Sequence, residues 1–283
     1  MRKGIILAGG SASRLNPTTK YITKHLLPVY DKPMINYSLS ILMLAKIKNI
    51  LIICNKRDLN SFQDYLSDGK RLGINISYAI QEKPNGLAEA FIIGEKFLNR
   101  DPAALILGDN IFFGAGLQKI LINANKSDRS MIFLKNVSNP KRFGVAYFDK
   151  KNKKLKKIVE KPKKPKSELA VTGLYFYNND VVKLAKKLKP SKRGELEITD
   201  LNNLYIKKKK LSFVKLSRST IWKDAGTFDS LIESGNIIKN AQAQDIIQIG
   251  LLEEISIRNK WVDKSKIIES IKDKHLRNYL KKI

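Results

Sequence analysis

The sequence is poor in cysteine and histidine. Its 283 residues include one cysteine, Cys54, and two histidines, His25 and His275. A single cysteine excludes a disulfide framework, and its place at the end of the apolar run 50–54 predicts a buried thiol rather than a nucleophile. Without a second cysteine or an HxxxH pair, a zinc site is not expected. This cysteine usage indicates a reducing, cytoplasmic location.

Long hydrophobic runs are also missing. The first apolar segment, 4–8, ends at Gly9 and Gly10, and no later run approaches the roughly 18 residues that cross a bilayer. We therefore expect neither a signal peptide nor a membrane partner. No GxSxG pattern supports a serine hydrolase. The 43% of hydrophobic residues is nevertheless enough for a full core.

Acidic residues are few. The chain has 26 Asp and Glu against 54 Lys and Arg, which gives a formal net charge of +28. Only 11 of the 54 are Arg, the residue favoured for bidentate phosphate and base recognition. The lysines cluster in 150–157, 161–166, 186–189 and 207–210, near the ends of predicted elements. Solvated surface or a coding bias toward Lys, Asn and Ile explains them best, so a nucleic-acid partner is not expected; a polyanion-binding face is the alternative.

Short apolar strands alternate with amphipathic helices through the first half of the chain, a pattern typical of a layered α/β sheet. We expect strands at 3–7, 50–54, 74–80 and 103–107, and helices at 33–46, 58–66 (with Asp58 as N-cap) and 87–98. A mixed or antiparallel addition is expected from strands 131–137, 144–148, 155–159 and 171–177. Helices 180–188 and 198–208, strand 211–216 and a helical tail follow. We predict a single domain, with a core over 1–227 and a helical appendage over 228–283.

The first strand runs into a glycine-rich turn, Gly-Gly-Ser-Ala-Ser-Arg at 9–14. It matches neither the P-loop nor the GxGxxG fingerprint. Paired glycines let backbone N–H groups approach phosphate oxygens, and Arg14 adds a permanent cation. Arg14 and Lys24 would thus bracket a triphosphate. Taken alone, the turn fits an ordinary strand end equally well.

Two carboxylates have settings that suit a hard cation. Asp109 follows an apolar strand, and Asp224 lies in a compact segment far along the chain. Two carboxylates together with substrate phosphates are a usual way of holding Mg²⁺, although either Asp could simply cap a turn. Glu160 and Lys161 close another strand, where an acceptor and a donor could grip a polyhydroxyl substrate. Arg193 opens a Glu-rich segment that also fits an ordinary helix start.

Read together, these segments resemble one family over nearly the entire chain. The blocks are GIILAGGSASRL at 4–15, KHLLPVYDKPM at 24–34, LGDN at 107–110, EKP at 160–162, VTGLYFY at 171–177, RGELEITD at 193–200 and WKDAGT at 222–227. They are similar to those of the glucose-1-phosphate thymidylyltransferases. The resemblance implies a Rossmann-like, three-layer nucleotidyltransferase fold with a mixed central sheet, an added small sheet and C-terminal helices.

The same resemblance implies the reaction dTTP + α-D-glucose 1-phosphate → dTDP-glucose + pyrophosphate, the first step toward dTDP-rhamnose, related deoxysugars and polysaccharides. It also implies Mg²⁺, a homotetramer and feedback inhibition at a second nucleotide site. Catalytic roles would fall to Arg14, Lys24 and Lys161. Nucleotide contacts would come from Leu7, Gly9, Gly10, Gln81, Pro84, Gly86 and Asp109. The sugar phosphate would meet Gly144, Glu160, Lys161, Val171, Tyr175 and Arg193, and the metal would be held by Asp109 and Asp224.

The chain departs from the family pattern at several positions. Ala12 and Ser13 stand where Gly-Thr is usual, His25 replaces Gln, Phe143 replaces Tyr and Ala225 replaces Thr. His25 could introduce a pH dependence, and Phe143 and Ala225 would each lose a hydroxyl beside the site. None of these changes removes a predicted charge, so we expect activity to persist, slower or with looser substrate choice.

Three alternatives stay open at this point. A related transferase could use UTP or another sugar 1-phosphate, because one methyl group in an apolar pocket discriminates by only about 1–3 kcal/mol. A degenerate copy could bind nucleotide without turnover. A polyanion-binding protein could be built on the same fold.

Overall fold

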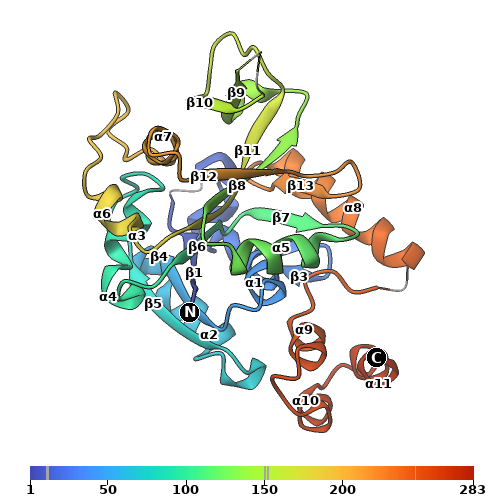
Figure 1. Cartoon of the computed structure of the whole chain (residues 1–283). Helices are drawn as coiled ribbons and strands as arrows, with labels where there is room; N and C mark the ends of the chain where they lie inside the picture. Colours follow the sequence, from blue (N-terminus) through green and yellow to red (C-terminus); the bar gives the residue numbers. More distant parts are fainter. Residues whose placement is uncertain (11–12, 150, 152, 246) are drawn as a thin grey trace.

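The fold is organised around one large mixed sheet (Figure 1). The computed structural model describes residues 1–10, 13–149, 151, 153–245 and 247–283. Over these residues the sheet has nine strands, seven of them in the order β10-β9-β11-β6-β1-β4-β5, while β8 pairs with β11 and with β12. The strands are β1 (Lys3–Ala8), β4 (Asn49–Cys54), β5 (Asn75–Ile80), β6 (Ala103–Leu107), β8 (Ser130–Asn136), β9 (Gly144–Phe148), β10 (Leu155–Glu160), β11 (Leu169–Tyr177) and β12 (Leu211–Lys215).

Strands β6, β1, β4 and β5 are parallel, and their sequences explain why. Strands β1, β4 and β6 are almost continuously apolar and buried, as expected for parallel strands covered on both faces. Strand β11 runs antiparallel to β6 and brings β8 and β9 into the same sheet. Its pairing with β8 has a register shift between Val171 and Tyr175, while β6 pairs with residues 174–177 and β9 with Ala170.

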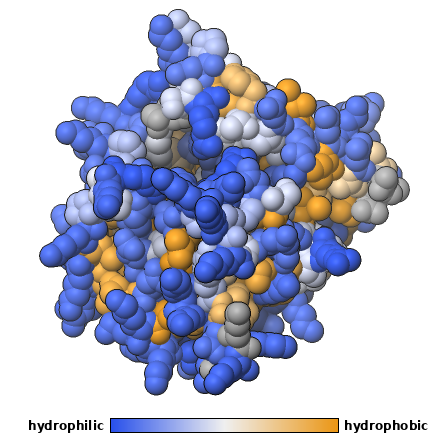
Figure 2. Space-filling model, turned by 90° about the horizontal axis from the view of Figure 1, so that it is seen from above, coloured by the Kyte–Doolittle hydropathy of each residue, from blue (hydrophilic) through white to orange (hydrophobic). Residues whose placement is uncertain are grey.

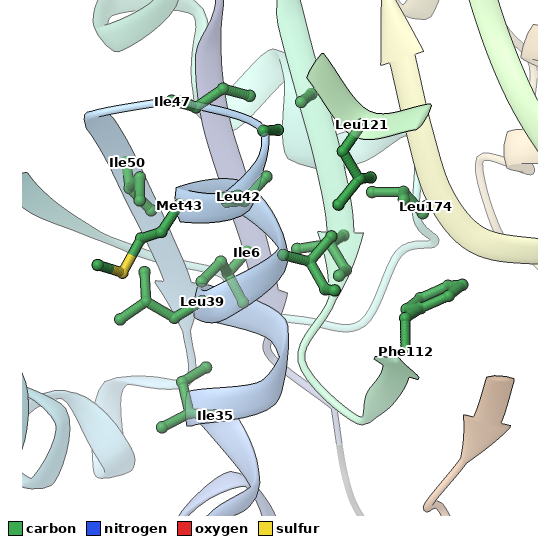
Figure 3. Packing of buried hydrophobic residues seen from close by; sticks show 14 of the residues in the cluster. Ile6, Ile35, Leu39, Leu42, Met43, Ile47, Ile50, Phe112, Leu121 and Leu174 are labelled. Atoms are coloured by element: carbon green, nitrogen blue, oxygen red, sulfur yellow. The ribbon is translucent and has the colours of Figure 1, made fainter. Parts of the chain in front are cut away.

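Helices cover both faces of the sheet. The helices are α1 (Met34–Leu44), α2 (Leu59–Leu66), α3 (Glu89–Ile93), α4 (Glu95–Leu98), α5 (Leu117–Lys126), α6 (Val181–Ala185), α7 (Ile198–Lys207), α8 (Phe228–Asp245), α9 (Leu252–Arg258), α10 (Lys264–Ser270) and α11 (Lys274–Lys282). On one face, Ile6 and Ile50 pack against Leu39 and Met43 of α1 and, further along, Leu121 of α5 (Figure 3). The opposite face packs against α3, α6 and α7. This is the expected three-layer α/β architecture.

Two small sheets lie beside the main one. Strand β7 (Asn110–Phe113) pairs antiparallel with β13 (Ile221–Asp224), and β2 (Pro28–Val29) pairs with β3 (Lys32–Pro33). The β7–β13 pair joins segments more than 100 residues apart, and it begins directly after the end of β6. It therefore brings the end of β13 to the carboxyl edge of the parallel strands.

Most predicted strands and helices are confirmed within one or two residues, and the tail after 228 is largely helical. Three predictions were wrong in detail. Residues 87–98 form two short helices divided at Gly94, and 180–188 shortens to the five residues of α6. The Asp58 side chain does not cap α2 but pairs with Arg57. Strands β7 and β13 were not predicted, because four residues each are too few to show a period. Helix α5 was also missed, although its buried Leu117, Leu121 and Ala124 have helical spacing. The division into a core and an appendage stays a prediction.

The burial of the single cysteine is confirmed. Cys54 is fully buried, and burial raises the pKa of its thiol to about 11, which keeps it protonated near neutral pH.

No described helix combines the length and apolar character needed to cross a bilayer. Figure 2, which looks down on the end of the molecule that carries β9 and β10, shows a mostly hydrophilic face with scattered hydrophobic patches.

One buried hydrogen bond fastens α7 to the sheet and can be tested. The Tyr177 hydroxyl donates to Asn202 Oδ1 at 2.6 Å, and both side chains are buried. Replacing Tyr177→Phe leaves that oxygen without this donor, so the free energy of unfolding should fall by about 1–3 kcal/mol. Urea unfolding measures the loss. The matched control is Tyr147→Phe. Among the described residues the Tyr147 hydroxyl accepts one exposed hydrogen bond, from the Lys166 N–H, so its loss should change stability by less than about 0.5 kcal/mol. Equal losses in the two variants would contradict the assignment.

Candidate functional site

A cavity of about 570 Å³ opens at the carboxyl ends of the parallel strands, where ligands bind in open α/β sheets. Its walls come from the segments after β1 and β6, from β9 to β11, and from the start of α7 and the end of β13. Of the residues predicted from the sequence, those that line it are Arg14, Asp109, Gly144, Glu160, Lys161, Val171, Tyr175, Arg193 and Asp224. Residues far apart in the sequence are thus brought into one site.

Lys24 joins this site through Asp109. It begins a short 3₁₀ turn, and its Nζ lies 2.6 Å from Asp109 Oδ2, with both side chains about one-eighth exposed. The Asn110 amide donates to the other oxygen, Oδ1, at 3.0 Å. Burial alone would raise the pKa of the Asp109 carboxyl, but the Lys24 ammonium and these hydrogen bonds outweigh it and hold that pKa well below its usual value. Asp109 is therefore an anion throughout the physiological pH range.

Asp224 lies beside Asp109 because β13 pairs with β7. Asp224 stands opposite Asn110 in that ladder, and the Ala225 N–H donates to the Asp109 carbonyl at 2.9 Å. The pKa of Asp224 is raised, first by burial and then by the negative charge of Asp109. Arg142 approaches its Oδ2 at 3.5 Å, and the Arg14 guanidinium lies against Gly226, next to Asp224 Oδ1. Two carboxylates that repel one another in a half-closed cavity are well suited to share a divalent cation.

The opposite wall combines hydrogen-bond acceptors with cations. Glu160 ends β10, and its Oε2 accepts from the Thr199 hydroxyl at 2.5 Å. Arg193 Nη2 donates to both carboxylate oxygens of Glu197, at 2.8 and 2.9 Å, and lies 3.6 Å from Glu160 Oε1. Lys161 Nζ stands 4.0 Å from Glu160 Oε1 and is half exposed. Val171 and Tyr175 line the same cavity and are buried, so close packing holds this part of its wall in place.

The predicted nucleotide contacts form a neighbouring group at the same edge of the sheet. Gly9 packs so tightly on Gln81 that a Cβ built on it would lie 2.5 Å from Gln81 Oε1. Gly86 has φ +107°, and a Cβ there would collide with the backbone of Leu196. The Leu7 carbonyl accepts from the N–H of residue 108, directly before Asp109. Gly10 and Pro84 lie in the loops that follow β1 and β5, and of the predicted nucleotide contacts only Asp109 is among the described residues that line the large cavity.

Several residues that shape the site were not predicted. Asn110 Oδ1 accepts from the Trp222 indole N–H at 2.7 Å and from the Gly173 N–H at 3.1 Å. Asn110 thereby ties β7, β11 and β13 together around Asp109. Thr199, Arg142 and Trp222 also line the cavity. Most of these residues lie inside or next to the recognised blocks, but their roles depend on tertiary contacts that local patterns do not reveal.

Two of the predicted effects of the family departures were wrong. His25 is buried, its Nδ1 has no hydrogen-bond partner among the described residues, and burial together with Lys24 lowers its pKa to about 3. The ring of the folded chain is therefore neutral near pH 7 and brings no change of charge to the site there. Ala225 is fully buried in an apolar cluster with Met34 and Ile111, so a Thr hydroxyl at this position would not face the cavity. Phe143 does line the cavity, packed on Trp222. Ala12 lies outside the described residues.

Comparison with known proteins agrees with this geometry. Residues 3–241 match the family model described as nucleotidyl transferase. A glucose-1-phosphate thymidylyltransferase of Neisseria meningitidis is 50% identical over 94% of this chain and 93% of its own length. That of Mycobacterium tuberculosis is 45% identical over 94% and 92%. The chain belongs to the nucleotidyl transferase family, in the group of the glucose-1-phosphate thymidylyltransferases.

Solved structures give the same result. A Bacillus anthracis chain, provisionally named a glucose-1-phosphate thymidylyltransferase and crystallised with a sucrose, superimposes with a TM-score of 0.77 at 42% identity, covering 87% of this chain and 97% of that one. A UDP-glucose pyrophosphorylase bound to UDP-glucose gives a TM-score of 0.73 at 27% identity, covering 85% and 99%. The nucleotidyltransferase fold expected from the sequence is confirmed.

The buried histidine predicts how stability responds to acid. In the unfolded chain His25 takes up a proton below its ordinary pKa of 6.5, whereas the folded chain resists protonation until about pH 3. Its contribution to stability is therefore complete above pH 6.5 and is lost as the pH falls toward 3. Between pH 7.5 and pH 5, the wild type should lose about 2 kcal/mol more unfolding free energy than His25→Gln. Urea unfolding at both pH values tests this, and parallel losses would contradict it.

Proposed function

We propose that this chain transfers a thymidylyl group from dTTP to α-D-glucose 1-phosphate, releasing pyrophosphate. The observation that carries the proposal is one cavity that holds a cationic end at Arg14, an anionic pair at Asp109 and Asp224, and a wall of acceptors and cations around Glu160 and Arg193. Such a site suits a reaction between two phosphate-bearing substrates, of which one is a sugar. The relatives named glucose-1-phosphate thymidylyltransferase support this substrate pair.

In the proposed reaction, a phosphate oxygen of the sugar phosphate attacks the α-phosphorus of dTTP. A new P–O bond forms, the bond to the β-phosphate oxygen breaks, and that electron pair leaves with pyrophosphate. Arg14 and Lys24 would offset the charge that grows on the leaving group, while Lys161 and Arg193 hold the attacking phosphate. Glu160, kept in place by Thr199, would accept hydrogen bonds from sugar hydroxyls. Positioning and charge neutralisation, rather than covalent catalysis, would supply most of the rate.

We propose Mg²⁺ as the cofactor, held by Asp109 and Asp224. The donor set fits, because both groups are carboxylates and the negative charge of one raises the pKa of the other. The charges of the cavity support the same conclusion. Its described lining carries four Lys or Arg side chains but five carboxylates, although both substrates are anions. A bound Mg²⁺ would supply the missing positive charge next to the α-phosphate.

A homotetramer and a cytoplasmic location complete the proposal. Helix α8 exposes Phe228 and Ile232, and nearby parts of the chain expose Tyr30 and Ile247, all more than 40% accessible. Large apolar side chains exposed in this way support an interface with another copy. The free, buried Cys54 supports a reducing compartment.

Turnover tests the proposed activity directly. Purified protein with glucose 1-phosphate and Mg²⁺ should release pyrophosphate from dTTP only when the sugar is present. UTP should be used less well, by a factor between about 10 and 200, because it lacks only one methyl group. Coupled detection of pyrophosphate measures both rates. Absence of sugar-dependent release by folded protein, with any nucleotide, would reject the proposed activity.

The role of the two carboxylates can be tested by substitution. Asp109→Asn and Asp224→Asn should each lower kcat by at least about a hundredfold, because each removes a charge that binds the cation and replaces a carboxylate oxygen by a donor. The Mg²⁺ concentration needed for half-maximal rate should rise in both. Asp68→Asn is the matched control, since Asp68 pairs with Lys70 on the exposed surface. An unchanged rate in Asp109→Asn would show that the site has been wrongly assigned.

A further inference from the structure

The Glu89 carboxylate accepts two side-chain amides at the start of α3. Its Oε2 accepts from Gln81 Nε2 and its Oε1 from Asn85 Nδ2, each at 2.8 Å. Glu89 is half-buried and Gln81 is almost fully buried, at 3% exposure. No ion pair involving Glu89 is found among the described residues. Both of its oxygens are therefore committed to these two amides.

This arrangement fixes the orientation of the Gln81 amide. An ionised carboxylate can only accept hydrogen bonds, so the NH₂ group of Gln81 must point toward Glu89. The carbonyl oxygen then points the other way, and in the structure Gln81 Oε1 lies directly against Gly9. A partner that could both donate and accept would allow the amide to rotate by half a turn. Glu89 allows one orientation, in which the side facing Gly9 is an acceptor.

The loop around this acceptor is held equally firmly. The Asn85 carbonyl accepts from the Leu196 N–H at 2.7 Å, and the Leu196 carbonyl accepts from the Ala88 N–H at 3.1 Å. Gly86, between them, fits only because it lacks a side chain. The main chain of Gln81 is tied to β4, since its N–H donates to the Cys54 carbonyl at 2.8 Å. The acceptor at Gln81 is thus presented by a preformed frame.

We infer that Glu89 is a positioning residue for nucleobase selection. By holding the Gln81 amide, it presents an acceptor to the base and favours pyrimidines whose ring N3 carries a hydrogen. Thymine and uracil have that N–H, whereas N3 of cytosine is itself an acceptor and would face Oε1 with no proton between them. This acceptor does not distinguish thymine from uracil, because both bases carry the N3 hydrogen. The inference rests on the proposed function and on the nucleotide contact at Gln81 that the family resemblance implies, with the base beside this side chain.

The test is the ratio of dTTP to dCTP affinity, measured by titration calorimetry with Mg²⁺ and no sugar. The wild type should bind dTTP at least about tenfold more tightly, because dCTP leaves a buried acceptor without a donor. In Glu89→Ala the Gln81 amide is free to rotate, so the ratio should fall to within about threefold. In turnover assays the change should appear in the nucleotide KM rather than in kcat.

Two further variants separate positioning from a merely structural role. Glu89→Gln keeps the size of the side chain but can donate as well as accept, so it allows both orientations of the Gln81 amide and should lower the dTTP to dCTP ratio toward that of Glu89→Ala. Asn85→Ala removes the other amide but leaves the Gln81 contact, so its ratio should match the wild type. A loss of preference in Asn85→Ala equal to that in Glu89→Ala would point to the loop as a whole and overturn the inference.

The remaining outcomes are also decisive. Sugar-dependent turnover with an unchanged dTTP to dCTP ratio in Glu89→Ala would overturn this inference and leave the proposed function standing. Equal binding of dTTP and dCTP by the wild type would overturn it even if Glu89→Ala did not fold. Failure of the wild type to bind or turn over any nucleotide would instead reject the proposed function itself.

Discussion

The closeness of two partly buried carboxylates is the constraint on which the rest of the site depends. Asp109 and Asp224 repel one another, and the raised pKa of Asp224 reflects that repulsion together with burial. The fold holds them together through the β7–β13 ladder and offsets their charge with Lys24, Arg14 and Arg142. Asn110, with every oxygen and nitrogen of its side chain engaged, fixes the same junction to β11. Removing any one of these contacts would leave a buried charge less well compensated.

The sequence predicts the sheet better than the site. Strands of the sheet are marked by the composition of short segments, whereas the site is assembled by contacts between segments far apart in the chain. Apolar runs such as 3–7 and 103–107 indicate buried parallel strands by themselves, since burial on both faces demands that composition. Strands β7 and β13 have only four residues each, and they are strands because each pairs with the other across more than 100 residues. That pairing cannot be read from local periodicity. It is nevertheless what brings Asp224 to Asp109.

Site residues show the same division. Nine of the lining residues, among them Arg14, Asp109 and Glu160, could be predicted because short motifs mark them, and the structure collects them in one cavity. Residues that work through a neighbour, such as Glu89, carry no local signal. The errors at His25 and Ala225 have a related cause. A substitution next to a predicted site residue was assumed to face the ligand, whereas both side chains turn into the core. A position next to a site residue in the sequence does not determine where a side chain points, because that direction is set by packing.

The chain as a whole is strongly basic, whereas the described lining of its main cavity is slightly acidic, and this difference bears on function. The chain carries +28, yet the described lining of its main cavity has one more carboxylate than cation. Exposed lysines are screened over about 8–10 Å at physiological ionic strength, so they contribute little to affinity inside a cavity. Paired carboxylates, by contrast, would oppose phosphate binding unless a cation lay between them. This charge pattern supports the proposal that phosphates bind here together with a metal ion, as a nucleoside triphosphate would, rather than as a bare polyanion.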